Sequence, residues 1–309
     1  MLIDLFVFAV SLCLVVKGAT MANKYAARLA RSFCLSKYIV GFVVVAVISI
    51  LPETFVAINS AIKGIPSFGL GTLLGSNVAD LTLVFSIILV VAGKGIKVQS
   101  RVLKNRWFYS LLLFLPLVLG LDGHFSRLEG AALILAGGIF YFAVLRDGRE
   151  KTLPTACATD RLKDFAWLLL GMAVLLVGAY FTVESATALA ASLKVNPILI
   201  GMLVVGLGTT LPELLFSLRC VKKNDDSLAV GDILGTVLAD ATIVVGILAL
   251  MSPFLFPVKI IYITGSFMVV ASFVLFYFMH SGRSLSKKEG YLLLIFWLIF
   301  VLVEFIANR

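Results

Sequence analysis

Hydrophobic residues along the chain form ten long runs separated by short polar stretches. The runs cover approximately residues 3–22, 38–62, 67–92, 107–121, 127–146, 164–190, 196–219, 227–251, 258–279 and 289–307. Each run is almost uniformly apolar, whereas the strands of a transmembrane barrel would alternate polar and apolar side chains. A run of about 20 apolar residues is long enough to cross a bilayer as a helix. The pattern therefore predicts an all-α polytopic membrane protein with about ten transmembrane helices.

The composition places the chain in a lipid bilayer. Of its 309 residues, 61% are hydrophobic and 14% are charged, and the mean hydropathy is +1.09, which is typical of polytopic membrane proteins. Ten spans with short loops leave no room for a separate soluble domain. The first run lacks the basic start and the small-residue cleavage site of a signal peptide, so we expect it to remain as the first helix.

Lysine and arginine are concentrated in alternate loops. Residues 24–37, 94–106, 146–163, 219–223 and 283–288 hold 20 of the 26 basic residues. Because cytoplasmic loops carry the excess of positive charge, we expect these loops in the cytoplasm and both termini outside, in the plasma membrane. This bias, with anionic lipid at the cytoplasmic face, explains the net charge of +9. The charge therefore gives no reason to expect nucleic acid as a partner.

An internal repeat appears at a fixed offset of 160 residues. Gly41–Ile87 aligns with Gly201–Ile247 without a gap, and both segments contain Leu-Pro-Glu, at residues 51–53 and 211–213. We expect two halves, residues 1–146 and 164–309, joined by a short cytoplasmic linker, residues 147–163. Five helices per half is an odd number, so the second half must enter the membrane from the opposite side. The sequence thus predicts two inverted five-helix repeats.

Five carboxylates lie within the apolar runs: Glu53, Asp80, Glu213, Asp232 and Asp240. Each costs about 2.5–3.5 kcal/mol or more at the centre of a transmembrane helix, and residues of this kind are functional by default. Four of the five form two pairs at the 160-residue offset, without lysine or arginine nearby to neutralise them. They therefore indicate a site for a cation.

Hydroxyl groups accompany these carboxylates at helical spacing. Ser49, Thr209, Ser76 and Thr236 each precede a carboxylate by four residues, which places them one turn away on the same helix face. A further turn back lie Thr72 and Asp232. Oxygen ligands without histidine or cysteine favour hard cations. Among these, Ca2+ accepts irregular coordination by roughly six to eight oxygens and fits a transport site better than Mg2+ does.

Proline precedes a glutamate once in each half, at Pro52 and Pro212. A proline removes an amide donor and frees backbone carbonyl oxygens where it interrupts a helix. Broken helices at matching positions of two halves indicate a transporter's binding site near the middle of the membrane. Gly71 and Gly75, like Gly231 and Gly235, have a small-xxx-small spacing that predicts close helix packing.

The paired Leu-Pro-Glu segments, with Gly-Ser-Asn at residues 75–77 and Gly-Thr-Val at residues 235–237, resemble the two alpha repeats of the calcium/cation antiporter superfamily, which includes the sodium/calcium exchangers. The resemblance covers nearly the whole chain. It implies an antiporter that exchanges Ca2+ for Na+ by alternating access, with Ca2+ held by Glu53 and Glu213. It further implies Na+ ligands at Ser49, Thr209 and Thr210. The family's second motif corresponds to Ser76, Asn77, Asp80, Thr236 and Asp240.

Departures from the family pattern leave the coupling ion open. Ile48-Ser49-Ile50 stands where the family usually has Gly-Thr-Ser, so one hydroxyl ligand is lost. Thr72 and Asp232 stand where asparagine is common, and Asp80 often appears as asparagine, so this site is more acidic. Closely spaced carboxylates cannot all be ionised without a bound cation. Exchange of Ca2+ or another divalent cation for H+ is therefore an alternative, and a K+-assisted variant comes after both.

Two other classes of function fit the sequence less well. A cation channel can use acidic rings and hydroxyls, but channels usually assemble from several identical subunits around the pore, whereas inverted duplication within one chain supports switching between inward-open and outward-open states. We expect a monomer. A membrane enzyme would need a placed nucleophile or metal-binding histidines, so we expect neither catalytic residues nor a cofactor. Glu184, Asp164 and Glu304 lie near predicted helix ends, where we expect solvation, and the two histidines fall in predicted loops.

Overall fold

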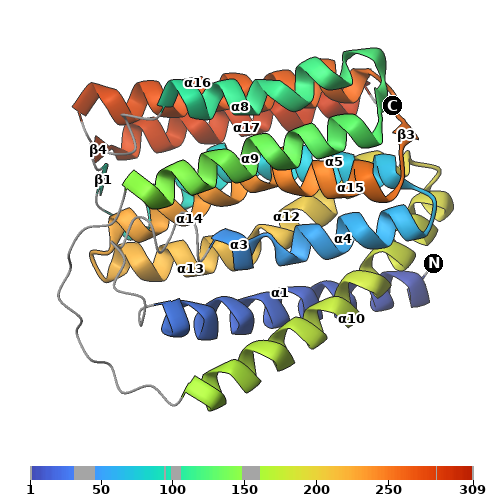
Figure 1. Cartoon of the computed structure of the whole chain (residues 1–309), viewed down its shortest axis with the longest axis horizontal. Coiled ribbons are helices and arrows are strands. Elements are labelled where there is room, and N and C mark those ends of the chain that lie inside the picture. Colours follow the sequence, from blue (N-terminus) through green and yellow to red (C-terminus); the bar gives the residue numbers. More distant parts are fainter. Residues whose placement is uncertain are drawn as a thin grey trace.

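The structure is a computed structural model, and it describes residues 2–30, 46–93, 95–98, 106–147, 161–282 and 284–307. Within these ranges the chain is almost entirely helical (Figure 1). The linker predicted at residues 147–163 lies mostly outside the described residues. So does the first part of the second predicted span, up to residue 45.

The helices of the first half follow the predicted runs. They are α1 (Leu2–Ala30), α3 (Ala46–Ser49), α4 (Leu51–Ile62), α5 (Pro66–Ala79), η3 (Asp80–Val84), α6 (Phe85–Ala92), α8 (Arg106–Leu119), η4 (Gly120–Asp122) and α9 (Arg127–Asp147). The η3 segment is π-helical and η4 is a 3-10 turn. Since α5, η3 and α6 join end to end, they form one long span.

The helices of the second half repeat this order. They are α10 (Arg161–Leu193), α11 (Pro197–Ile200), η5 (Gly201–Val205), α12 (Gly206–Thr209), α13 (Leu211–Lys222), α14 (Asp226–Ala239), η6 (Asp240–Val244), α15 (Val245–Met251), η7 (Ile261–Gly265), α16 (Ser266–Gly282) and α17 (Lys287–Ala307). Here η5, η6 and η7 are π-helical.

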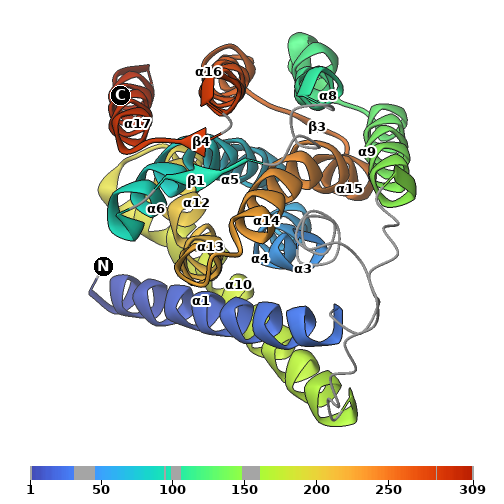
Figure 2. The ribbon, with the colours of Figure 1, turned by 90° about the vertical axis from the view of Figure 1, so that its left-hand side faces the viewer.

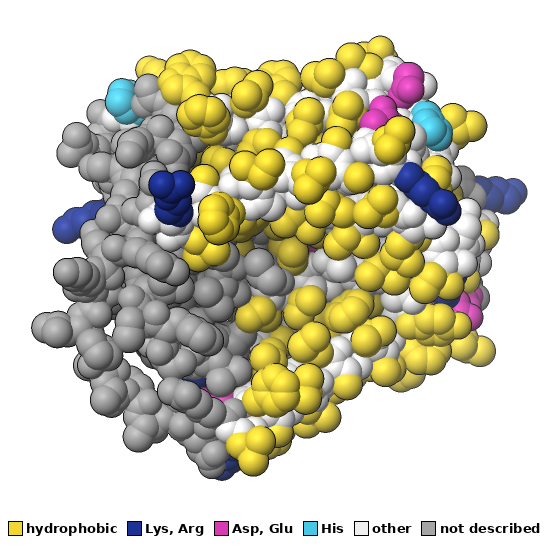
Figure 3. Space-filling view, viewed as in Figure 1, with side chains coloured by type: hydrophobic (Ala, Val, Ile, Leu, Met, Phe, Trp, Pro, Cys, Tyr) yellow, Lys and Arg dark blue, Asp and Glu magenta, His cyan; other side chains and the backbone are white. Residues whose placement is uncertain are grey.

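The predicted membrane architecture is confirmed. Eight helices in the described ranges are long and apolar enough to cross a membrane, and a shorter apolar helix covers Trp107–Asp122. The remaining predicted span ends in α3 and α4, and its start lies outside the described residues. In Figure 3 hydrophobic side chains cover the middle of the visible face, while lysine and arginine side chains lie toward its two ends and acidic side chains mainly toward the right-hand end. This is the surface expected of a protein surrounded by lipid.

Equivalent helices of the two halves keep the 160-residue offset. The bounds of α4 and α13, of α5 and α14, of η3 and η6, and of α9 and α17 each differ by that number. Two short antiparallel ladders join the halves: β1 (Ile96–Lys97) pairs with β4 (Ser284–Leu285), and β2 (His124–Phe125) pairs with β3 (Phe254–Leu255). Figure 1 places β1 and β4 at one end of the bundle and β3 at the other. Corresponding elements thus lie at opposite ends, as inversion requires.

The long helices α1 and α10 form an antiparallel pair along one side of the bundle (Figure 2). Glycines allow their backbones to touch, since a Cβ on Gly18 would lie 2.6 Å from the Leu175 amide nitrogen. The spans formed by α5–η3–α6 and by α14–η6–α15 are the most buried ones in the described chain. Four elements that carry the predicted ligands, α4, α5, α13 and α14, therefore meet in the interior.

Candidate cation site

Both halves contain a helix that breaks just before its Leu-Pro-Glu sequence. The break falls at Ile50, between α3 and α4, and at Thr210, between α12 and α13. The two residues have nearly the same backbone angles, with φ −70° and ψ −5° at Ile50 and φ −78° and ψ −10° at Thr210. Proline two residues later cannot donate to the carbonyl four residues before it. The predicted interruptions are confirmed, and each sets a glutamate in the first turn of the following helix.

All five intramembrane carboxylates are buried, with at most 1% of any of them exposed. Glu53 and Glu213 lie on α4 and α13, and Asp232 lies on α14. Asp80 and Asp240 each begin a π-helical segment, η3 and η6. A π-helical turn widens the helix locally and is frequent at functional sites. The sequence contains no recognisable signal for these turns, so they were not predicted.

These carboxylates gather in one region and repel one another. Glu53 interacts electrostatically with Asp80, Glu213, Asp232 and Asp240, although the five residues come from four different helical spans. Within the described ranges, both carboxylate oxygens of Glu53, Asp80, Glu213 and Asp240 lack a hydrogen-bond partner. Buried charge is costly unless it is paired or coordinates a cation. The cluster is thus suited to bind positive charge.

The carboxylates do not form a closed metal site by themselves. No three acidic, histidine or cysteine side chains among the described residues converge closely enough to hold one metal ion. A cation bound here would need further oxygen ligands, such as hydroxyls, backbone carbonyls or water, as Ca2+ commonly uses.

The predicted hydroxyl ligands lie on the carboxylate-bearing helices or at the helix breaks that precede them, and all of them are at least nine-tenths buried. Several donate to carbonyl oxygens of their own helix: Thr72 to Phe68 (3.0 Å), Ser76 to Leu73 (2.9 Å), Thr209 to Gly206 (3.0 Å) and Thr210 to Leu207 (3.0 Å). A hydroxyl that donates its hydrogen keeps lone pairs that can coordinate a cation. The side-chain oxygens of Asn77 and Thr236 have no hydrogen-bond partner in the described structure.

A hydrogen bond between two of the predicted ligands joins the two halves. The hydroxyl of Ser49, on α3, donates to the Oδ1 atom of Asp232, on α14, at 2.9 Å. Thr209 of the second half lies beside the Glu53 carboxylate of the first half. The structure thus brings together residues that are about 180 positions apart in the sequence.

Glycines determine how closely the helices around the site approach. A Cβ on Gly71 would lie 2.8 Å from Ile198 Cγ2, and a Cβ on Gly75 would lie 2.5 Å from the Met202 carbonyl oxygen. The packing role predicted for these two glycines is therefore confirmed. The glycines bring α5 against the second half, next to Ser76.

Three expectations for acidic residues outside the cluster need correction or detail. Glu304 was expected to be solvated, but it is 1% exposed and accepts a hydrogen bond from Thr264. Asp164 is also buried and pairs with Arg28 at 3.4 Å. Glu184 is exposed as expected, and it pairs with Lys63.

The two histidines belong to regular secondary structure and not to loops, since His124 lies in β2 and His280 lies in α16. The prediction that both fall in loops was therefore wrong.

The fold and this buried acidic region define a membrane transporter built from inverted repeats. A family model described as sodium/calcium exchanger protein matches residues 3–146 and 163–306. The chain therefore belongs to the sodium/calcium exchanger protein family, and the resemblance seen in the sequence is confirmed.

Individual relatives agree with this assignment. The chain is 30% identical over 266 residues to the putative antiporter CaxA of Alkalimonas amylolytica, covering 82% of each chain. It is 28% identical over 268 residues to the inner membrane protein YrbG of Escherichia coli, covering 82% of this chain and 81% of YrbG. A solved structure of the sodium-calcium exchanger NCX_Mj, soaked with Na+ and Ca2+, is 25% identical, covers 97% of each chain and has a TM-score of 0.73.

Proposed function

We propose that this protein is a secondary antiporter that exchanges Ca2+ for Na+ across the membrane by alternating access. The observation that carries the proposal is the repeat-related pair Glu53 and Glu213, buried at the two helix breaks with carboxylate oxygens that have no hydrogen-bond partner among the described residues. Two anionic ligands suit a divalent cation. Family membership and the similarity to an exchanger structure soaked with Na+ and Ca2+ support the same conclusion.

The ligands are assigned by type. Glu53 and Glu213 hold Ca2+, and Asp80 and Asp240, one turn after Ser76 and Thr236, complete the acidic region. Na+ is bound by neutral oxygens of Ser49, Thr209 and Thr210 beside the helix breaks. Supporting this division, these hydroxyls are buried and lie where proline leaves a backbone carbonyl without its usual donor. Asp232, Thr72 and Asn77 line the same region.

The orientation follows from the basic residues. The end of the bundle that carries β1 and β4 also carries Lys97, Lys223 and Lys287, whereas few basic residues, Lys63 among them, lie at the opposite end. Basic loops remain in the cytoplasm. We therefore place the β1 and β4 end in the cytoplasm, both termini outside and the protein in the plasma membrane.

The proposal is tested by flux in proteoliposomes that contain the purified full-length protein. Ca2+ uptake is expected when an outward Na+ gradient is imposed and absent when it is dissipated. Uptake that needs no opposing gradient would indicate a leak or channel and would refute exchange. A second series with a pH gradient and no Na+ separates the coupling ions, because a Ca2+/H+ antiporter would respond to pH alone.

Substitution of the two glutamates tests the site itself. Glu53→Gln and Glu213→Gln keep the side-chain volume but remove the charge, so each variant is expected to lose exchange while eluting as a folded protein. Glu304→Gln is the matched control, since Glu304 is an equally buried glutamate that lies on α17, outside the group of five carboxylates, and accepts a hydrogen bond from Thr264. Normal exchange in either test variant would remove that glutamate from the site.

The specific observation that favours H+ as the alternative coupling ion is the Asp232 side chain. Its repeat-related residue in the first half is Thr72, so an ionisable carboxyl group stands here in place of a hydroxyl. Among the described groups, only its Oδ1 atom accepts a hydrogen bond. If the pH-gradient series drives uptake and the Na+ series does not, the coupling ion of the proposal is replaced and its calcium site is retained.

A further inference from the structure

A cavity of about 310 Å3 opens at the β1 and β4 end of the bundle, between α1, α13 and the start of α14. It runs along α13 from Lys223 inward to Pro212, the residue before Glu213. Basic side chains line its outer part, namely Lys24 and Arg28 of α1, Arg219 of α13 and Lys223, which directly follows α13. We call this space the basic vestibule.

The positive charge of the basic vestibule is only partly balanced. Asp225 is the acidic residue in its lining, and Arg28 also pairs with Asp164 at 3.4 Å. Lys24, Arg219 and Lys223 form no ion pair within the described parts of the chain, although Lys24 lies over the ring of Tyr25. Several cations that face one cavity repel one another, and an anion between them would remove that repulsion.

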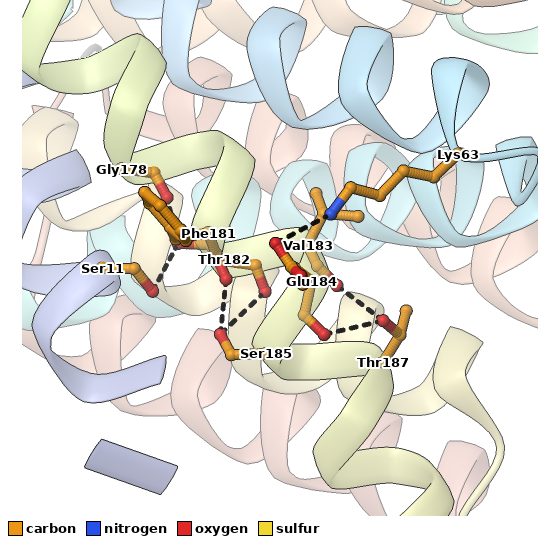
Figure 4. A network of polar contacts seen from close by, with 9 residues as sticks. All are labelled: Ser11, Lys63, Gly178, Phe181, Thr182, Val183, Glu184, Ser185 and Thr187. Carbon is orange, nitrogen blue, oxygen red and sulfur yellow. Dashed lines mark hydrogen bonds and ion pairs between the residues drawn. The ribbon is translucent and has the colours of Figure 1, made fainter. Parts of the chain in front are cut away.

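At the opposite end of the bundle, the repeat-related positions carry opposite charges and form an ion pair. At the 160-residue offset, Lys24 corresponds to Glu184 and Lys223 corresponds to Lys63. Lys63 and Glu184 form an ion pair at 3.5 Å, and the Lys63 ammonium lies 4.3 Å from the centre of the Tyr180 ring. Figure 4 shows Lys63 directed toward Glu184, which α10 carries. In the basic vestibule, two lysines occupy the places of this attractive pair.

An apolar groove continues the basic vestibule. A second cavity, of about 460 Å3, shares Thr20, Lys24 and Arg219 with it. Its other walls are formed by Lys17 and by apolar or aromatic side chains, with Val16, Met21 and Trp167 of α1 and α10 and Leu215 of α13 among them. Trp167 and Leu215 are 39% and 40% exposed, so both side chains are accessible from outside the bundle. A ligand that fills both spaces would meet basic side chains in the first cavity and both basic and apolar side chains in the second.

We propose that an anionic phospholipid binds here, with its headgroup phosphate between Lys24, Arg219 and Lys223 and an acyl chain along Trp167 and Leu215. The lipid comes from the leaflet at the β1 and β4 end. Charge complementarity supports an anionic headgroup, and the adjoining apolar groove supports a phospholipid as its source and not a free anion. The binding site does not depend on which ions the protein exchanges.

Trp167 permits a local test of the lipid site. The full-length chain has three tryptophans, so Trp107→Phe and Trp297→Phe leave Trp167 as the reporter. The protein is reconstituted in phosphatidylcholine with increasing amounts of phosphatidylglycerol brominated on its acyl chains, which quenches nearby tryptophan. Brominated phosphatidylcholine gives the reference. We expect Trp167 to be quenched by the brominated phosphatidylglycerol at a lower fraction than by the neutral lipid.

Two double variants separate a specific site from general attraction to a basic surface. Lys24→Gln with Lys223→Gln is expected to weaken the preference for phosphatidylglycerol by at least about tenfold, since each basic residue near a membrane surface contributes roughly 1 kcal/mol, or about fivefold. Lys163→Gln with Lys222→Gln removes the same charge from two exposed lysines outside both cavities, and the preference should remain. Equal losses in the two double variants would overturn the proposal.

Two further measurements test whether the ligand is a lipid and whether Lys24 binds it. Inorganic phosphate at the headgroup concentration should not reduce the preference, and a reduction would overturn the assignment to a lipid. Lys24→Glu restores the charge pattern of Lys63 and Glu184, so it should lose the preference while the protein elutes normally. An unchanged preference in that variant would also overturn the proposal.

Discussion

Gly75 offers a direct test of how closely the two halves pack around the acidic region. It lies on α5, next to Ser76, and faces Met202 of η5 in the other half. The substitution Gly75→Ala adds one methyl group at this contact. On the other side of the same contact, a Cβ on Gly206 would lie 3.1 Å from the Ser76 amide nitrogen. Neither backbone can therefore move far without meeting the other.

The cost of Gly75→Ala can be worked from these distances. The added Cβ would lie 2.5 Å from the Met202 carbonyl oxygen, 2.6 Å from its Cγ atom and 2.9 Å from its Cα atom, whereas ordinary contacts begin at 3.4 Å. Relief of the worst contact requires a movement of about 0.9 Å, and two of the three atoms belong to the backbone. Insertion of a methyl group into a packed interior typically costs about 1–3 kcal/mol.

Thermal unfolding of the purified protein in detergent measures this cost. We expect the melting temperature of Gly75→Ala to fall by about 3–10 °C. Gly138→Ala on α9 is the matched control, because a Cβ there would meet nothing within 4 Å. Both substitutions gain the same helix propensity, up to about 1 kcal/mol, so their difference reports the clash. If the two variants melt at the same temperature, the close approach of α5 and η5 is refuted.

Three further contacts are each tested by substitution. Ser49→Ala removes the donor to Asp232 and should lower the free energy of unfolding by about 1–3 kcal/mol. Ser272→Ala is the control and should cost less, because it loses only a hydrogen bond to its own helix. Equal losses of stability would contradict the hydrogen bond between the halves. In a double-mutant cycle, Lys63→Gln and Glu184→Gln should show a coupling energy below about 1 kcal/mol, because the Glu184 side chain is 57% exposed to solvent. A larger coupling energy would mean that the ion pair is better shielded from solvent. Glu304→Ala should destabilise the protein by about 1–3 kcal/mol, because it leaves the Thr264 hydroxyl only the weakly accepting Met202 sulfur. Glu304→Gln should retain most of the stability, and the reverse order of thermal stabilities would argue against the hydrogen bond from Thr264.

The sequence was sufficient for features that depend on local pattern. The apolar runs predicted the positions of the helices. The 160-residue offset predicted that helices of the two halves would match, and residues 51–62 and 211–222 do form helices with equivalent bounds. Pro52 and Pro212 located both helix breaks to within two residues, because proline lacks the amide that a continuous helix needs.

Features that depend on packing between distant segments could not be predicted in this way. Glu304 is buried beside Thr264 of a neighbouring helix, whereas its place near the end of a predicted helix indicates solvation. The π-helical turns after Asp80 and Asp240 insert an extra residue into a helix without glycine or proline to mark it. Such turns are stabilised by the surrounding fold, so a single sequence gives little sign of them.

The contact between Ser49 and Asp232 shows how one substitution makes the centre of the site asymmetric. By the repeat, its counterpart would join Thr209 and Thr72. Those two hydroxyls donate instead to carbonyls of their own helices, those of Gly206 and Phe68. A threonine hydroxyl can donate its hydrogen bond to a carbonyl of its own helix in this way, whereas an ionised carboxylate can only accept hydrogen bonds and needs a donor from another segment. The aspartate at position 232 therefore takes the Ser49 hydroxyl of the other half, and the symmetric helix breaks surround an asymmetric set of ligands.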